Sequence, residues 1–158
     1  MEVTALVKYT WVKADVPLEL PVRQVYGIVF SDSGKVLLRV DRGEYKLTGG
    51  KPEQHDNSFA ETLKREYLEE LNVEITEIHY LGYLLVEENE AQYAQIRMIA
   101  KIKQVGTIRP DPDNGKTYQR FWVSPNDVKG YLAYPDSAGN QMIDAAIAFA
   151  AKKYGLKF

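Results

Sequence analysis

An arginine and three glutamates lie within one six-residue segment, and their spacing suggests a metal-binding helix. They are Arg65, Glu66, Glu69 and Glu70. Because successive residues of a helix are rotated by about 100°, Glu70 falls within the apolar stripe of residues 59–71 and Glu66 lies at its edge. Carboxylates four residues apart repel each other and lose solvation beside a core. A magnesium ion removes both penalties, because it prefers carboxylate oxygens and keeps waters that a phosphate can replace.

Two neighbouring features bear on whether this segment is a ligand site or a solvated helix face. Favourable pairs four residues apart, Glu61 with Arg65 and Arg65 with Glu69, fit a purely structural acidic helix. Gly49 and Gly50, however, end a short β-like segment before the helix, and adjacent glycines allow the backbone to approach a ligand closely. A strand, a double glycine, a polar loop and an acidic helix together favour a ligand site.

The composition of the whole chain narrows the classes of function. A length of 158 residues, with 45% hydrophobic and 27% charged residues, indicates a single globular domain over residues 1–158. The net charge of -2 argues against a long nucleic acid as partner. The absence of cysteine excludes disulfides, zinc-thiolate sites and thiol nucleophiles. Because no stretch resembles a signal peptide or a membrane span, we expect a cytoplasmic protein without a membrane partner.

Hydrophobic patterning predicts a chain rich in strands with two longer helices. A helix begins after the cap Ser58 and ends near Leu71, where Asn72 suits a left-handed conformation. A short helix follows Ser124-Pro125, and an Ala-rich helix covers residues 140–154. Together these elements predict an α/β (α+β) fold, with a mixed sheet that packs between helices. Strands are predicted at residues 3–12, 22–30, 35–40, 45–47, 75–87, 93–105 and 118–123.

The acidic segment and its surroundings resemble the Nudix hydrolases. The family's box is a glycine, five residues, a glutamate, seven residues, then Arg-Glu, an apolar residue, any residue, Glu-Glu, any residue, glycine and an apolar residue. Gly50 matches the opening glycine, the run Arg65-Glu66-Tyr67-Leu68-Glu69-Glu70 matches the centre, and Val73 matches the final apolar position. The resemblance implies a Nudix-like mixed sheet sandwiched between α-helices.

The box departs from the family pattern at three points. The loop after Gly50 is one residue longer, and Asn57 replaces the first glutamate, with Asp56 beside it. Glu53, in the same loop, is a weaker candidate for that glutamate. Asn72 replaces the closing glycine. Asn57 and the longer loop motivate an alternative, a catalytically impaired Nudix-fold module that binds nucleotides.

Carried over residue by residue, the resemblance implies a role for each matching side chain. Mg²⁺, or Mn²⁺ as the alternative, would be held by Glu66, Glu69 and Glu70. The carbonyl of Gly50, or of Gly49 beside it, would complete the coordination. Arg65, Glu69 and Glu70 would be the catalytic group, in which Arg65 orients the carboxylates by ion pairing.

The implied reaction is Mg²⁺-dependent attack of water on phosphorus, in the diphosphate of a nucleoside diphosphate linked to another moiety. The expected partner is this small diphosphate substrate. The sequence leaves the oligomeric state open, with a homodimer as one option. The family's general base often lies on a loop outside the box, and the candidates here are Glu87, Glu88, Glu90, Asp111 and Asp113.

Overall fold

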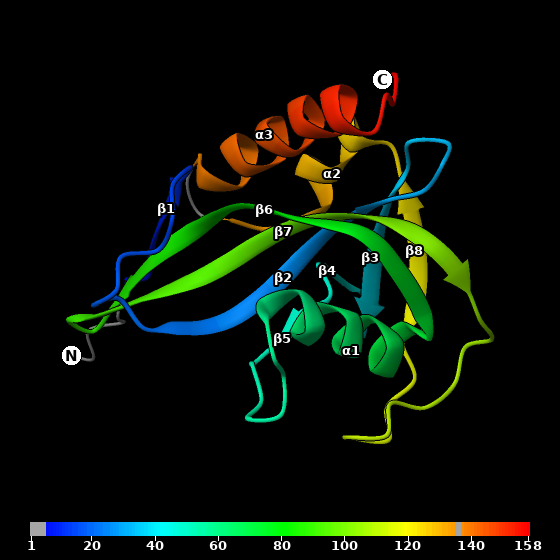
Figure 1. The fold of residues 1–158 in the computed structure, drawn as a ribbon, viewed down its shortest axis with the longest axis horizontal. Coiled ribbons are helices and arrows are strands. Elements are labelled where there is room, and N and C mark those ends of the chain that lie inside the picture. Colours follow the sequence, from blue (N-terminus) through cyan, green and yellow to red (C-terminus); the bar gives the residue numbers. More distant parts are fainter. Residues whose placement is uncertain (1–5, 135–136) are drawn as a thin grey trace.

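The computed structural model describes residues 6–134 and 137–158, and a mixed eight-stranded sheet forms its centre (Figure 1). The main path of the sheet runs β1-β6-β7-β2-β3-β4, while β5 pairs with β2 and β8 pairs with β3. Strands β2 and β7 are parallel, and the other pairs are antiparallel. The strands are β1 (Lys8–Val12), β2 (Val22–Phe30), β3 (Val36–Asp41), β4 (Glu44–Lys46), β5 (Gly49–Gly50), β6 (Val73–Glu88), β7 (Ala91–Val105) and β8 (Gln119–Val123).

The strands agree closely with the predicted ranges. β2 has the predicted bounds, and β6 and β7 extend slightly beyond theirs. The strand predicted at residues 3–12 begins at Lys8, and its first three residues lie outside the described residues. The double glycine forms its own strand, β5, which pairs with β2 through Gly49 and Gly50.

Helix α1 (Phe59–Leu71) begins and ends at the residues that the sequence indicated. The Ser58 hydroxyl accepts a hydrogen bond from the Glu61 amide at 3.2 Å, which satisfies one of the free donors at the helix start. The Glu61 carboxylate accepts from the Asn57 amide at 2.9 Å, one residue earlier than in a regular capping box. Asn72 closes the helix at φ 52°, in the left-handed region.

The helices cover opposite faces of the sheet, as Figure 1 shows. The apolar side of α1 packs in one buried cluster with residues of β2, β6 and β7. Helices α2 (Pro125–Tyr131) and α3 (Ala138–Lys153) pack in a second cluster; α3 begins two residues earlier than predicted. This arrangement confirms the predicted sheet between helices. Within residues 6–134 and 137–158, no helix combines the length and apolar character needed to cross a bilayer.

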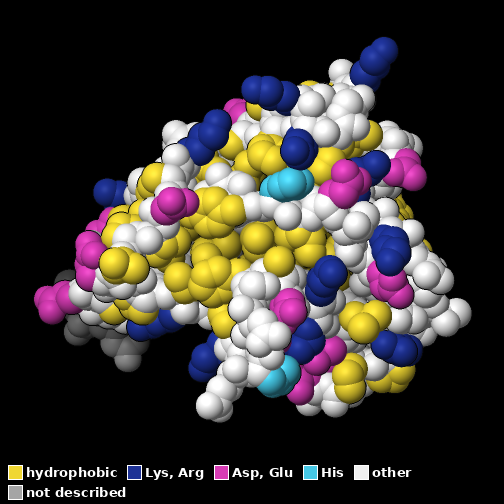
Figure 2. Space-filling model, viewed as in Figure 1, with side chains coloured by type: hydrophobic (Ala, Val, Ile, Leu, Met, Phe, Trp, Pro, Cys, Tyr) yellow, Lys and Arg dark blue, Asp and Glu magenta, His cyan; other side chains and the backbone are white. Residues whose placement is uncertain are grey.

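An apolar groove lies between α3 and the sheet. Leu81, Ala148 and Phe149 line it, with Lys13 and Lys152 among its basic residues. Figure 2 shows hydrophobic side chains gathered over β6 and β7, between α3 and α1. Because the charged residues of the groove are lysines, it supplies no ligands for a cation, and the acidic segment of α1 lies elsewhere.

Candidate active site

Close packing of α1 against β2 and β5 brings the acidic segment to the double glycine. The Tyr67 hydroxyl donates a hydrogen bond to the Gly27 carbonyl at 3.2 Å, deep in the core. The carboxylate of Glu66, the residue before Tyr67, lies against Gly50. A Cβ at Gly50 would lie 2.6 Å from Oε1 of Glu66, so only glycine leaves room for this approach.

Glu70 is buried beside the core, as the helical spacing predicted. Its side chain is 9% exposed, and Oε1 lies 3.1 Å from Nη1 of Arg39 on β3. The guanidinium of Arg39 also stacks on the ring of Tyr118, 4.6 Å from its centroid. The second oxygen of Glu70 is buried and has no hydrogen-bond partner. Burial raises the pKa of Glu70 to about 8, because Arg39 offsets only part of the lost solvation.

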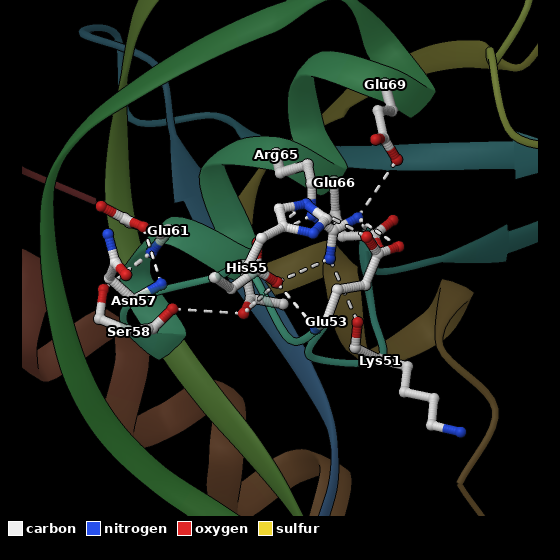
Figure 3. Close-up of polar contacts among 11 residues, drawn as sticks. Lys51, Glu53, His55, Asn57, Ser58, Glu61, Arg65, Glu66 and Glu69 are labelled. Carbon is white, nitrogen blue, oxygen red and sulfur yellow. Dashed lines mark hydrogen bonds and ion pairs between the residues drawn. The ribbon is translucent and has the colours of Figure 1, made fainter.

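Arg65 is the centre of an ion-pair network between α1 and the loop that precedes it (Figure 3). Its Nη1 lies 3.0 Å from Glu66 and 3.3 Å from both Glu69 and Glu53. Its Nε and Nη2 donate to the two oxygens of Asp56 at 3.0 and 2.9 Å. This forked pair is the strongest contact of the network, because two parallel charge-assisted bonds fix the guanidinium plane.

Asp56, and not Asn57 at the expected position of the box glutamate, supplies the acid of this loop that pairs with Arg65. Its carboxylate also accepts from the Glu53 amide and the Thr62 hydroxyl, both at 2.9 Å. Hydrogen bonds from Arg65 hold the pKa of Asp56 well below its usual range. Counting back from Arg65 misses Asp56, because the extra loop residue shifts that count by one position, whereas counting forward from Gly50 across five residues reaches it.

The other residues of the loop are less enclosed. The side chain of His55 is 70% exposed, and its Nε2 lies 3.3 Å from Glu53. Glu53, which the sequence indicated as a weaker candidate for the box glutamate, reaches Arg65 but is 41% exposed. The loop therefore uses Asp56 as its main anchor to the helix.

Asp111, on the loop after β7, faces the glutamates of α1. Its side chain is almost fully buried, and its charge contributes to the raised pKa values of all three glutamates. Burial is the main cause in each case, and it raises the pKa of Glu66 to about 7. The turn between β6 and β7 carries Glu87, Glu88 and Glu90. It lies at the end of β6 that is farther from α1, so these three acids are remote from the glutamates of α1 (Figure 1).

The carboxylates around Gly50 fit a hard divalent cation, although each of them is paired with an arginine in this structure. Among residues 6–134 and 137–158, no three acidic or histidine side chains are already arranged as a metal-binding group. Arg65 holds Glu66 and Glu69, whereas Arg39 holds Glu70. The partnerless oxygen of Glu70 and the close approach of Glu66 to Gly50 supply hard oxygen donors of the kind that Mg²⁺ prefers.

Comparison with known proteins decides the family. A family model described as the NUDIX domain matches residues 20–143, which include the whole acidic segment and its loop. The chain belongs to the Nudix family. This membership confirms the predicted Nudix resemblance and fold, and the class of enzyme, a Nudix-type pyrophosphohydrolase. Nudix hydrolases generally use divalent metal ions and act on small nucleotide-derived substrates.

Solved structures of other proteins share the fold. The E. coli ORF135 protein is 25% identical, with a TM-score of 0.59 over 87% of this chain and 98% of that chain. The Bacillus subtilis pyrophosphohydrolase BsRppH is 22% identical, with a TM-score of 0.58 and coverages of 93% and 89%. A MutT structure from work on Aliivibrio salmonicida and Vibrio cholerae is 20% identical, with a TM-score of 0.58 and coverages of 80% and 95%. No curated protein matches significantly.

The buried glutamates predict how the stability of this Nudix protein depends on pH without metal. Unfolded glutamates titrate near 4.5, whereas burial raises the pKa of Glu66 to about 7 and of Glu70 to about 8. The folded state therefore holds these protons more tightly. Stability is fully present below the unfolded pKa and is lost as pH rises through the folded values. We expect the thermal midpoint in EDTA to fall between about pH 5 and about pH 8.5.

Thermal unfolding at a series of pH values measures this effect. Excess Mg²⁺ should reduce the fall, because a cation that binds only the folded state stabilises it. The variant Glu66→Gln should also flatten the profile, since it removes one of the titrating groups. A midpoint that rises steadily from pH 5 to pH 8.5 in EDTA would contradict the burial of charge.

Proposed function

We propose that this Nudix protein is a Mg²⁺-dependent hydrolase of the diphosphate bond in a nucleoside diphosphate linked to another moiety. The observation that carries the proposal is the placement of buried Glu70, with one unpaired oxygen, beside Glu66 at the bare backbone of Gly50. Mn²⁺ is the alternative cation. The single-domain organisation and the cytoplasmic location remain predictions from the sequence.

The residues that would hold the cation are Glu66, Glu69 and Glu70, with the carbonyl of Gly50. When bound, Mg²⁺ neutralises charge on the phosphate oxygens and lowers the pKa of bound water. To bind it, the carboxylates must exchange their arginine contacts for the ion. Arg65 is able to remain in place during this exchange, because its fork to Asp56 is independent of the metal-facing glutamates.

Asp111 is our choice for the general base among the candidates outside the box. The side chains of Asp111 and of the three glutamates are close enough for their charges to interact, which fits one shared site. In the proposed reaction the oxygen of a water attacks phosphorus and its proton passes to the Asp111 carboxylate. The bond from phosphorus to the bridging oxygen breaks, and the leaving phosphate keeps that oxygen.

A nucleotide-binding module without activity is the second candidate. The observation that favours it is that Arg65 and Arg39 hold all three glutamates in this structure. A module would keep these ion pairs in the presence of nucleotide, whereas an enzyme must release them to the cation.

A substrate panel tests the proposal. Nucleoside diphosphates linked to sugars, to second nucleosides and to phosphate are incubated with Mg²⁺, Mn²⁺ or EDTA, and the products are identified. We expect cleavage of a diphosphate bond with Mg²⁺ and none in EDTA. Saturable nucleotide binding without turnover would instead support the module. Calorimetry that detects no uptake of a divalent cation, even with nucleotide present, would show that the acidic helix is structural.

A further inference from the structure

A second feature of the molecule is a cavity of about 310 Å³, at the junction of β1, β2, β3, β4 and β7 with the segment after α2. Its lining is aromatic and basic. Within the described part of the chain, none of its lining residues is acidic. Its lining includes Tyr26, Arg39, Lys46, Arg97 and Tyr134.

The cavity is next to the acidic site. Arg39 lines the cavity and at the same time pairs with Glu70 at 3.1 Å. Tyr26, another lining residue, is opposite Gly49 in the pairing of β2 with β5. The acidic site and the cavity thus share Arg39, and a ligand that reaches from the glutamates past Arg39 would enter this cavity.

Arg97, on β7, is buried in the cavity wall without a carboxylate partner. It is 2% exposed, yet no ion pair joins it to any acid of residues 6–134 and 137–158. Its Nε contacts the sulfur of Met142 at 3.2 Å, and its Nη2 contacts Tyr134 at 3.0 Å and the Gln95 side chain at 3.3 Å. Its Nη1 has only two backbone carbonyls at 3.5 Å.

The partners of Arg97 are thus neutral, and most of the contacts are long. Arg65 and Arg39, by comparison, both have carboxylates at 3.1 Å or less. A buried charge is expensive unless an opposite charge compensates it. The face of the Tyr26 ring, 4.8 Å away, provides part of that compensation but not a counter-ion. An oxyanion in the cavity would provide one, and its oxygens would replace the weak contacts of the guanidinium fork.

We propose that this cavity binds an oxyanion, a phosphate or a carboxylate, on the part of the substrate that lies beyond the hydrolysed diphosphate. Arg97 is its main ligand, and the Tyr134 hydroxyl beside it is an additional donor. The ammonium of Lys46, which also lines the cavity, pairs with Glu44 at 3.2 Å and would have to leave it to reach the anion. The inference rests on the proposed function for its link to catalysis, but anion binding itself requires neither metal nor turnover. The substrates would then be organic diphosphates that carry a second anionic group.

The competing explanation is that Arg97 is structural. It stacks on Tyr26 and bonds to Tyr134, so it would serve to anchor the segment after α2. The two explanations differ in what Arg97→Met should do. A structural arginine predicts loss of stability with or without an anion. An anion ligand predicts a variant that folds, because an apolar side chain replaces an uncompensated buried charge, but that no longer responds to anions.

The first experiment measures the thermal midpoint of the full chain in EDTA against rising inorganic phosphate or acetate, at constant ionic strength. We expect a saturable rise in wild type and none in Arg97→Met. The two anions distinguish a phosphate site from a carboxylate site. Arg23→Met is the matched control, because Arg23 also stacks on a tyrosine but is exposed and lies outside the cavity. If Arg97→Met does not fold, Arg97→Lys should keep the charge and a weaker response.

The second experiment compares hydrolysis of matched substrates, such as coenzyme A with dephospho-coenzyme A and a dinucleotide with and without a 2′-phosphate. Wild type should prefer the member with the extra phosphate by about tenfold or more in kcat/KM, and Arg97→Met should lose that preference. Equal anion responses in wild type and Arg97→Met, or none in wild type, would overturn the proposal. Anion binding without hydrolysis of any diphosphate would leave the anion site in place and refute the proposed function instead.

Discussion

Replacing Glu66 by glutamine is expected to lower kcat/KM by about a thousandfold or more, which corresponds to about 4 kcal/mol of transition-state stabilisation. The reason is the position of this side chain. Glu66 lies against the bare backbone of Gly50, and glutamine at this position keeps the shape but offers a neutral oxygen. A hard cation binds that oxygen more weakly than a carboxylate. The loss should appear in kcat more than in KM if the cation acts mainly on the transition state.

The same variant should not lose stability in EDTA at pH 8. Burial raises the pKa of Glu66 to about 7, so its carboxylate is an unfavourable charge in the folded state at that pH. Glutamine removes that charge, while Arg65 keeps its fork to Asp56. Thermal midpoints in EDTA and in Mg²⁺ measure both effects. Wild type should gain stability from Mg²⁺, and Glu66→Gln should gain much less.

Glu74→Gln is the matched control for this experiment. Glu74 is an exposed glutamate on β6, and its nearest cation, Lys103, is 3.9 Å away. Its replacement should leave both turnover and the Mg²⁺ response near wild-type values, since exposed ion pairs contribute little. Full activity in Glu66→Gln, or an unchanged response to Mg²⁺, would remove Glu66 from the proposed metal site.

Local signals in the sequence were sufficient for α1 and its burial pattern. Ser58 and Asn72 mark the ends of the helix because capping depends on a few neighbouring residues. The 100° rotation per residue placed Glu70 beside the core, and the structure agrees. Strand β2 was equally well defined, because its apolar run is bounded by a proline and a turn.

Contacts between distant segments could not be predicted in the same way. Arg39 reaches Glu70 only because β3 lies beside the face that α1 covers, and Asp111 arrives from the loop after β7. Neither residue carries a local signal that separates it from other charged residues. Arg97 has no local signal of burial either, because an arginine within a strand normally lies at the surface. Its burial depends on the parallel pairing of β2 with β7, where it is opposite Tyr26.

Asp56 shows how a single residue of loop length can mislead a motif. Counting back from Arg65 places Asn57 at the box glutamate, and this suggested an impaired site. In the structure the longer loop instead presents Asp56 to Arg65, so an acid is present in the network after all. The alternative of an inactive module therefore loses one of its two arguments, the missing acid, and keeps only the longer loop.

The variant Asp56→Asn is expected to lower the free energy of unfolding by about 2 kcal/mol, less than for a fully buried ion pair because the loop borders solvent. The neutral amide cannot accept both bonds from Arg65 together with those from Thr62 and the Glu53 amide. Because the pKa of Asp56 lies well below its unfolded value, its contribution is present above the unfolded pKa of 3.8 and is lost as pH falls. Urea unfolding at pH 7 measures the loss.

Asn57→Ala provides the control, because the bond of Asn57 to Glu61 comes from its backbone amide and survives the change. It should alter stability by less than about 0.5 kcal/mol. A double-mutant cycle with Arg65→Met separates the forked pair from the rest of the loop. The double variant should lose less stability than the sum of the losses in the two single variants. Additive losses would mean that Asp56 stabilises the loop without Arg65. A larger loss of stability in Asn57→Ala than in Asp56→Asn would indicate that position 57, and not Asp56, corresponds to the box glutamate. The argument for an impaired site would then hold again.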